Sequence, residues 1–125
     1  MFDTTKAFSG FAVDDLDAAN QFYGETLGIE VRTEDMGILT LRLSGDRVIV
    51  IYPKPDFTPA TYTILNFPVD DIDAAVDDLT CRGVELTRYD GFDHDGKGVV
   101  RDPGGPNIAW FTDPAGNILS VLQDQ

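Results

Sequence analysis

The pattern of hydrophobic and polar positions along the chain occurs twice. Residues 11–19 recur 56 positions later as residues 67–75, and seven of the nine residues are identical. The similarity resumes between residues 28–31 and 83–86 after a slip of one position. Chance rarely returns both the identity and the order, so we interpret the chain as two copies of one unit. They join near residues 53–59, where three prolines discourage regular structure.

Each copy predicts one strand followed by one helix. The strands are expected at residues 7–13 and 61–69, which are rich in aromatic and β-branched residues. Helices should follow, because apolar residues then recur at helical spacing. These positions are Leu16, Ala19, Tyr23 and Leu27 in the first copy and Ile72, Ala75, Val76 and Leu79 in the second. The aspartate pairs 14–15 and 70–71 stand at the helix starts, and we favour N-capping over a metal or acid–base cluster for them.

Gly28 and Gly83 should end these helices, and three strands should follow each of them. The expected strands are residues 29–34, 38–43 and 47–52 in the first copy and residues 84–89, 108–112 and 117–122 in the second. The predicted fold is therefore α+β, a single domain of two tandem βαβββ modules, residues 1–55 and residues 56–125. Residues 90–107 contain five glycines and are too irregular for a strand, which is typical of a working loop or lid.

Charge and cysteine content narrow the classes of partner. Nine Lys and Arg against 22 Asp and Glu give a formal charge of −13, which disfavours nucleic acid and anionic membranes. A cationic or neutral small molecule suits this field, although acidity also serves solubility alone. The apolar run 48–52 is too short to cross a bilayer. Cys81 has no partner for an intramolecular disulfide and the chain starts without a secretory pattern, so we expect a cytoplasmic location.

His94, the one histidine, lies between Asp93 and Asp95. It could be a general base or part of a carboxylate-rich ion site, but a solvated loop residue is the interpretation we favour. The segment lacks the bidentate glutamate of a calcium loop. If the loop closes over a cavity, Tyr89, Phe92 and His94 should contact a ligand. Cys81 is expected to be inert, since no histidine is predicted near it.

Two groups of residues resemble the vicinal oxygen chelate superfamily, which includes glyoxalase I, bleomycin-resistance proteins, extradiol dioxygenases and fosfomycin-resistance enzymes. The first group is residues 13–19 with Phe22-Tyr23 and Leu27-Gly28, and the second is residues 109–117, which contain Asp-Pro-Ala-Gly-Asn. The resemblance covers the whole chain. It implies two βαβββ modules whose curved mixed sheets form a shared concave cavity, commonly in a homodimer.

Enzymes of that superfamily typically hold a divalent metal through the first and last strands of each module. The corresponding positions here are Phe8, Ile64, Ser120 and, approximately, Val50. None offers the imidazole, carboxylate or thiolate that such a site needs. Among their neighbours only Asn66 offers an oxygen. We therefore expect no metal and no other cofactor.

The same resemblance, combined with alternation along strands, predicts the cavity wall. Its residues are Phe8, Val50, Tyr52, Ile64, Asn66, Ile118, Ser120 and Leu122. Either Trp110 or Phe111 should join them, since neighbours on a strand point to opposite faces. With the loop residues, the candidate ligand-binding set is Phe8, Val50, Tyr52, Ile64, Asn66, Phe92, His94, Trp110 and Ser120. The alternative is that these side chains pack together and leave no cavity.

The leading functional hypothesis is a metal-independent protein that binds a small, cationic or aromatic molecule in an apolar cavity, as the bleomycin-resistance branch implies. The competing hypothesis is a metal-dependent lyase, isomerase or dioxygenase of the same superfamily that recruits its metal through His94, Asp93 and Asp90. A third is a purely structural interaction domain.

Overall fold

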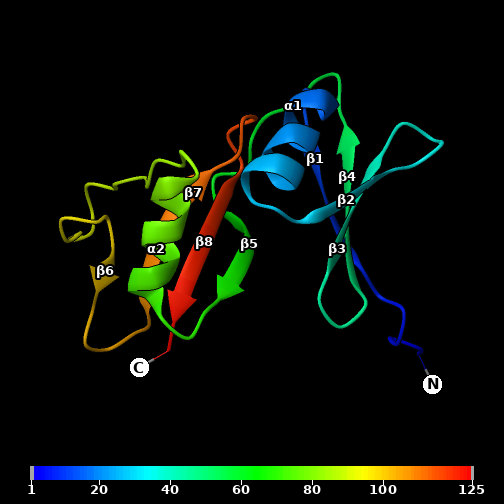
Figure 1. Ribbon diagram of the computed structural model, residues 1–125. Helices are drawn as coiled ribbons and strands as arrows, with labels where there is room; N and C mark the ends of the chain where they lie inside the picture. The colour runs from blue at the N-terminus through cyan, green and yellow to red at the C-terminus, as the bar shows by residue number, and fades with distance from the viewer. Residues whose placement is uncertain (1, 125) are drawn as a thin grey trace. The chain divides into compact units, whose positions relative to one another are not determined.

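The computed structural model describes residues 2–124, and the chain divides into two compact units, Met1–Pro59 and Ala60–Gln125. Each unit holds one four-stranded mixed sheet with helix on one face, so the predicted α+β class and the repeated βαβββ module are confirmed (Figure 1). The first unit contains β1 (Ser9–Val13), α1 (Leu16–Asn20), the π-helix η1 (Gln21–Thr26), β2 (Glu30–Thr33), β3 (Leu39–Leu43) and β4 (Arg47–Pro53). The second contains β5 (Thr63–Pro68), α2 (Ile72–Cys81), β6 (Val100–Arg101), β7 (Asn107–Thr112) and β8 (Ile118–Gln123).

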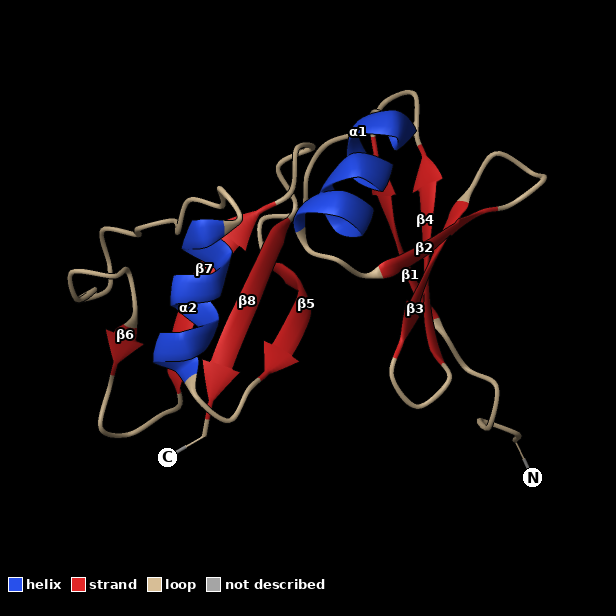
Figure 2. Ribbon diagram, viewed as in Figure 1, coloured by secondary structure: helices blue, strands red, loops and turns tan. Residues whose placement is uncertain are grey.

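The two sheets have the same topology (Figure 2). The strand order is β1-β4-β3-β2 in one sheet and β5-β8-β7-β6 in the other. In each, the first strand pairs in parallel with the last, and the remaining pairs are antiparallel. The first and last strands of a module thus lie side by side, which brings residues about 40–55 positions apart into one row of the sheet.

One aspartate of each pair caps its helix, as predicted. The carboxylate of Asp15 accepts a hydrogen bond from the Ala18 amide at 3.2 Å, and that of Asp71 accepts one from the Ala74 amide at 3.1 Å. Gly83, at a φ of 87°, occupies the left-handed position after α2. The acidic clusters at both helix starts are therefore accounted for by folding.

The first helix differs from the expectation. Only residues 16–20 are α-helical, and η1 continues them with wider turns, as in the bond from the Leu27 amide to the Phe22 carbonyl at 2.9 Å. The wider turn brings Tyr23 into complete burial, with its ring 5.7 Å from that of Phe11. The departure from regular helical spacing thus coincides with the burial of this large side chain.

Alternation along the strands separates a covered face from an open face in each unit. In β1, β3 and β7 buried side chains occupy every second position, and the intervening positions form the face that no helix of the same unit covers. In β8, Ser120 is buried as well as its neighbours Leu119 and Val121. The core includes Phe11, Val13, Ala19, Tyr23, Leu39, Leu41 and Ile51 in the first unit and Ile72, Val76, Leu79, Val84, Val99, Val100, Ala109, Phe111, Leu119 and Val121 in the second.

The predicted strand at residues 84–89 is wrong. Only Thr87 makes a bridge, to Trp110, and its amide donates to the Trp110 carbonyl at 2.7 Å. Farther along the same edge of β7, residues Val100–Arg101 pair with Ile108 and Asn107. The chain leaves this edge after Thr87 and returns at β6, so two short pieces share the place of one strand. We call the intervening residues 88–99 the excursion.

Candidate functional site

A polar and aromatic row crosses the open face of the second sheet. Asn66 of β5, Ser120 of β8 and Trp110 of β7 are register partners, and Thr87 extends the row. The Ser120 hydroxyl donates to Asn66 Oδ1 at 2.6 Å, and Ser120 is fully buried. This places Asn66 and Ser120 on one face, as alternation predicted. Trp110, half-buried, joins that row, whereas Phe111 lies in the core.

Four rings gather at the Trp110 end of this row. The Trp110 ring centroid lies 5.3 Å from that of Tyr89, 5.2 Å from that of Phe92 and 6.1 Å from that of His94. The excursion therefore folds back over β7 and covers part of the open face. Phe92 remains 53% exposed, so the cluster presents an aromatic surface to solvent. We call Tyr89, Phe92, His94 and Trp110 the aromatic cluster.

His94 uses both ring nitrogens within the excursion. Nε2 accepts a hydrogen bond from the Tyr89 amide at 2.9 Å, and Nδ1 lies 2.7 Å from the Gly98 carbonyl oxygen. In this arrangement neither nitrogen points to an open coordination position. The histidine thus contributes a ring surface and backbone contacts, while its predicted contact with a ligand remains a prediction.

Ion pairs and capping bonds attach the excursion to the rest of the unit. The Asp95 carboxylate accepts from the Val99 and Lys97 amides at 2.9 Å each and from Arg101 Nε at 2.9 Å. Arg101 also reaches Asp73 of α2 at 2.7 Å. Burial acts to raise the pKa of the Asp95 carboxyl, but the bonds from Arg101 and the two amides outweigh it and hold that pKa below its usual value.

The open face of the first unit carries the other predicted residues. Val50 and Tyr52 are the register partners of Gly10 and Ala12, which confirms that they share a face. Phe8 is 68% exposed and Tyr52 42% exposed. A Cβ at Gly10 would lie 3.1 Å from the Val50 carbonyl oxygen, so a side chain at this position of β1 would be crowded against β4. The register partners on β3 are polar, since Thr40 pairs with Val50 and Arg42 with Val48, so this face is apolar on β4 and polar on β3.

Ile64 departs from the expected register. The pairing of β5 with β8 shifts between Thr63 and Leu65, and Ile64 lies half-buried at that irregularity without a register partner of its own. Simple alternation therefore does not fix where its side chain points. Farther along, Pro68 and Leu122 are register partners.

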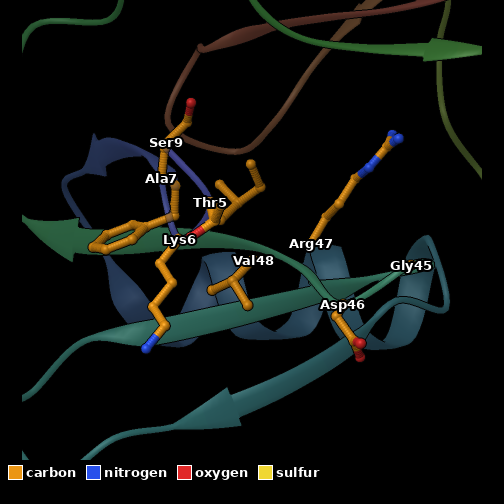
Figure 3. A pocket seen from close by; sticks show the side chains of 10 residues that line it. Thr5, Lys6, Ala7, Ser9, Gly45, Asp46, Arg47 and Val48 are labelled. Carbon is orange, nitrogen blue, oxygen red and sulfur yellow. The ribbon is translucent and has the colours of Figure 1, made fainter. Parts of the chain in front are cut away.

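A hollow of about 670 Å³ opens at one end of the first sheet (Figure 3). It is lined by Thr5, Lys6, Ala7, Phe8, Ser9, Gly45, Asp46, Arg47, Val48 and Ile49. Figure 3 shows the Lys6 and Arg47 side chains extending in different directions, so their charges do not converge on one point. Sequence reasoning missed this hollow except for Phe8, because isolated surface charges carry no periodic signal.

The Asp-Pro-Ala-Gly-Asn signature forms a tight turn between β7 and β8. The Asp113 carboxylate accepts from the Asn117 amide at 2.9 Å and from its side-chain Nδ2 at 3.1 Å. Both residues are buried, and Gly116 has a φ of 95°. This signature is therefore structural, and it sets the start of the strand that carries Ser120.

Residues 2–124 contain no group of three or more His, Cys, Asp or Glu side chains arranged to hold a metal ion. At the positions where the family carries metal ligands, Phe8, Val50 and Ile64 present hydrocarbon and the Ser120 hydroxyl is already bonded to Asn66. The side chains at these positions do not fit a catalytic divalent ion. No helix among the described residues is both long enough and apolar enough to span a membrane.

Comparison with solved structures gives the same fold. TnmS3, an antibiotic binding protein from Streptomyces sp. CB03234, is 25% identical, with a TM-score of 0.71 over 99% of this chain and 100% of that one. A glyoxalase/bleomycin resistance protein/dioxygenase superfamily member from Sphaerobacter thermophilus is 23% identical, with a TM-score of 0.72 over 98% and 100%. The fosfomycin resistance protein FosX from Listeria monocytogenes is 15% identical, with a TM-score of 0.73 over 99% and 94%.

No curated protein sequence matches this chain significantly. A family model does match it, over residues 7–121, and the match includes both modules and the Asp-Pro-Ala-Gly-Asn turn. The chain belongs to the Glyoxalase/Bleomycin resistance protein/Dioxygenase superfamily.

Proposed function

We propose that this protein binds a small aromatic molecule, preferentially a cationic one, and that it does so without a metal ion or other cofactor. The observation that carries the proposal is the aromatic cluster, in which the half-exposed Phe92 and the half-buried Trp110 lie 5.2 Å apart on the open face. A flat ring stacked on such a surface gains both burial and ring–ring contact. The adjacent Asn66–Ser120 pair supplies polar groups that orient it.

The charge of the excursion supports a cationic guest. Asp90 and Asp93 flank Phe92 in the sequence, and both are exposed. Cations are attracted to aromatic faces and to nearby carboxylates, while a net charge of −13 repels anions.

One relative supports a binding role. TnmS3 is described as an antibiotic binding protein. We infer a role in sequestering a toxic or valuable small molecule, with binding rather than chemistry as the activity. As part of this proposal, the protein acts as a homodimer in the cytoplasm.

Calorimetric titration tests the proposal directly. The protein is dialysed against EDTA and titrated with acridine orange, a planar aromatic cation, and with bleomycin. We expect saturable binding that Phe92→Ala weakens about tenfold, the equivalent of 1.4 kcal/mol. The matched control is Phe2→Ala, since Phe2 is 90% exposed and lies outside the aromatic cluster. Binding that requires added Ni²⁺, Zn²⁺ or Mn²⁺ contradicts the metal-free mechanism, and no binding of either probe contradicts the proposal itself.

A further inference from the structure

The excursion is built around the His94 ring. Its two nitrogens bond to backbone groups on either side, the Tyr89 amide at 2.9 Å and the Gly98 carbonyl at 2.7 Å. Gly98 has a φ of 95°, and a Cβ there would lie 2.9 Å from the Leu86 Cβ. The backbone at Gly98 is thus held in a conformation that suits only glycine, with its carbonyl directed at the imidazole.

These two contacts are compatible with only one form of the ring. A carbonyl oxygen only accepts, so Nδ1 must carry a hydrogen. A backbone amide only donates, so Nε2 must offer a lone pair. Only the neutral imidazole with its hydrogen on Nδ1 satisfies both contacts. A second proton, on Nε2, would face the Tyr89 amide hydrogen and remove that bond.

The ring is surrounded by aromatic side chains and lies near charged groups of both signs. Tyr89, Phe92 and Trp110 lie around it, and burial raises the pKa of the Tyr89 phenol, so that group stays neutral. Along the chain, Asp93 is exposed and the Asp95 carboxylate is engaged by two amides and Arg101. Arg88 contributes a positive charge nearby through its bonds to the Asp95 and Gly96 carbonyls at 2.8 and 3.1 Å.

We propose that His94 is a positioning residue for the aromatic cluster: its neutral ring holds Tyr89 and Phe92 against Trp110, and protonation releases them. Acidification therefore dismantles the aromatic surface while the sheet beneath it stays folded. The effect on ligand affinity rests on the proposed function, whereas the release of the excursion does not.

The chain provides two internal reporters, because it has one histidine and one tryptophan. The His94 ring signals followed by NMR give the pH at which this imidazole takes up its proton, and Trp110 fluorescence reports the surroundings of the indole. We expect the fluorescence to change with the same midpoint as the His94 ring, while far-UV circular dichroism is unchanged. A Trp110 signal that is flat across the His94 titration overturns the inference.

Two substitutions separate positioning from simple loss of a side chain. His94→Gln keeps an acceptor for the Tyr89 amide and cannot take up a proton, so its Trp110 fluorescence should not change over this pH range. His94→Leu removes both contacts, so it should show the released signal at every pH. An acid transition that persists in His94→Gln contradicts the inference, since another group must then cause it.

Titration with acridine orange above and below the His94 midpoint extends the test to binding. We expect affinity to fall about tenfold on acidification in the wild type and to stay constant in His94→Gln. Equal affinity on both sides of the midpoint, with the Trp110 transition intact, contradicts the ligand part of the inference. Absence of binding at every pH, with the transition intact, contradicts the proposed function and leaves the release mechanism supported.

Discussion

The two modules share a topology and differ at one strand. In the first, β2 is a continuous edge strand whose four residues, Glu30–Thr33, pair with β3. In the second, the equivalent edge is split between Thr87 and Val100–Arg101, and the chain between them forms the excursion. The repeat therefore accounts for the fold, and the departure from the repeat carries the rings that we assign to ligand binding.

The loops of the two modules are also held differently. The turn between β2 and β3 extends into solvent, and Met36 within it is 87% exposed. The excursion instead contains a bonded histidine, a capping aspartate and a lysine, Lys97, that forms ion pairs with Asp73 and Asp77 of α2. Restraint of this kind lowers the entropy lost when a ligand binds, which is the physical reason to place function on the second loop.

Core substitutions should have the largest effect and should not distinguish the modules. Ile51 in β4 and Leu119 in β8 are both fully buried in the last strand of their unit. Ile51→Ala and Leu119→Ala should each lower the free energy of unfolding by about 2–5 kcal/mol, measured by urea denaturation. A loss below about 1 kcal/mol at either site shows that one module lacks the core described above.

Removal of the Asp95 carboxylate should affect the second module alone. Asp95→Ala deletes the acceptor for two amides and Arg101, and its side chain is 34% exposed, so we expect a loss of about 1–2 kcal/mol in the free energy of unfolding. Amide hydrogen exchange should speed up at Lys97 and Val99 and stay unchanged in β2 and β3. Faster exchange throughout both sheets contradicts a local role.

The lowered pKa of Asp95 gives its contribution a defined pH range. A carboxyl whose folded-state pKa lies below its unfolded value of about 3.9 stabilises the native state above that value. The stabilisation is lost as pH falls through the folded-state pKa. The free energy of unfolding, measured by urea denaturation, should therefore be lower at pH 3 than at pH 5, and Asp95→Asn should reduce this difference. The effect is distinct from the His94 transition because Asp95→Asn leaves His94 in place.

The N-caps should give smaller and matched effects. Asp15→Ala and Asp71→Ala each remove one bond to a helix amide and should each cost about 1 kcal/mol. Asp14→Ala and Asp70→Ala serve as controls at the neighbouring aspartates. A cap effect in one module only would show that the repeated motif plays different parts in the two copies.

Sequence patterns predicted most of the fold because the repeat, and the residues that begin and end its helices, are local signals. Apolar spacing located α2, the aspartates located the caps, and alternation placed Asn66 and Ser120 on one face. The alternating residues 84–89 also resembled a strand, but pairing depends on what else competes for the edge of β7, and β6 and Thr87 share it. Local patterns cannot resolve such a competition between distant segments.

The candidate site was predicted less completely for related reasons. The contact of Tyr89, Phe92 and His94 with a ligand was expected only if the loop closes over a cavity, and it stays a prediction. The expectation of a solvated His94 is wrong, because both ring nitrogens are bonded within the loop, and this has no sequence signal. The π-helical turn at Tyr23 depends on the fit of one large side chain against Phe11. The shift at Ile64 depends on a strand register that alternation assumes and does not determine.

NMR during titration of the EDTA-treated protein with acridine orange shows whether the excursion provides the binding surface. We expect the Trp110 indole N–H and the His94 ring signals to shift in proportion to bound ligand, while the signals of Met36 and Phe2 stay in place. Saturable binding that shifts other residues and leaves Trp110 and His94 unchanged would contradict it.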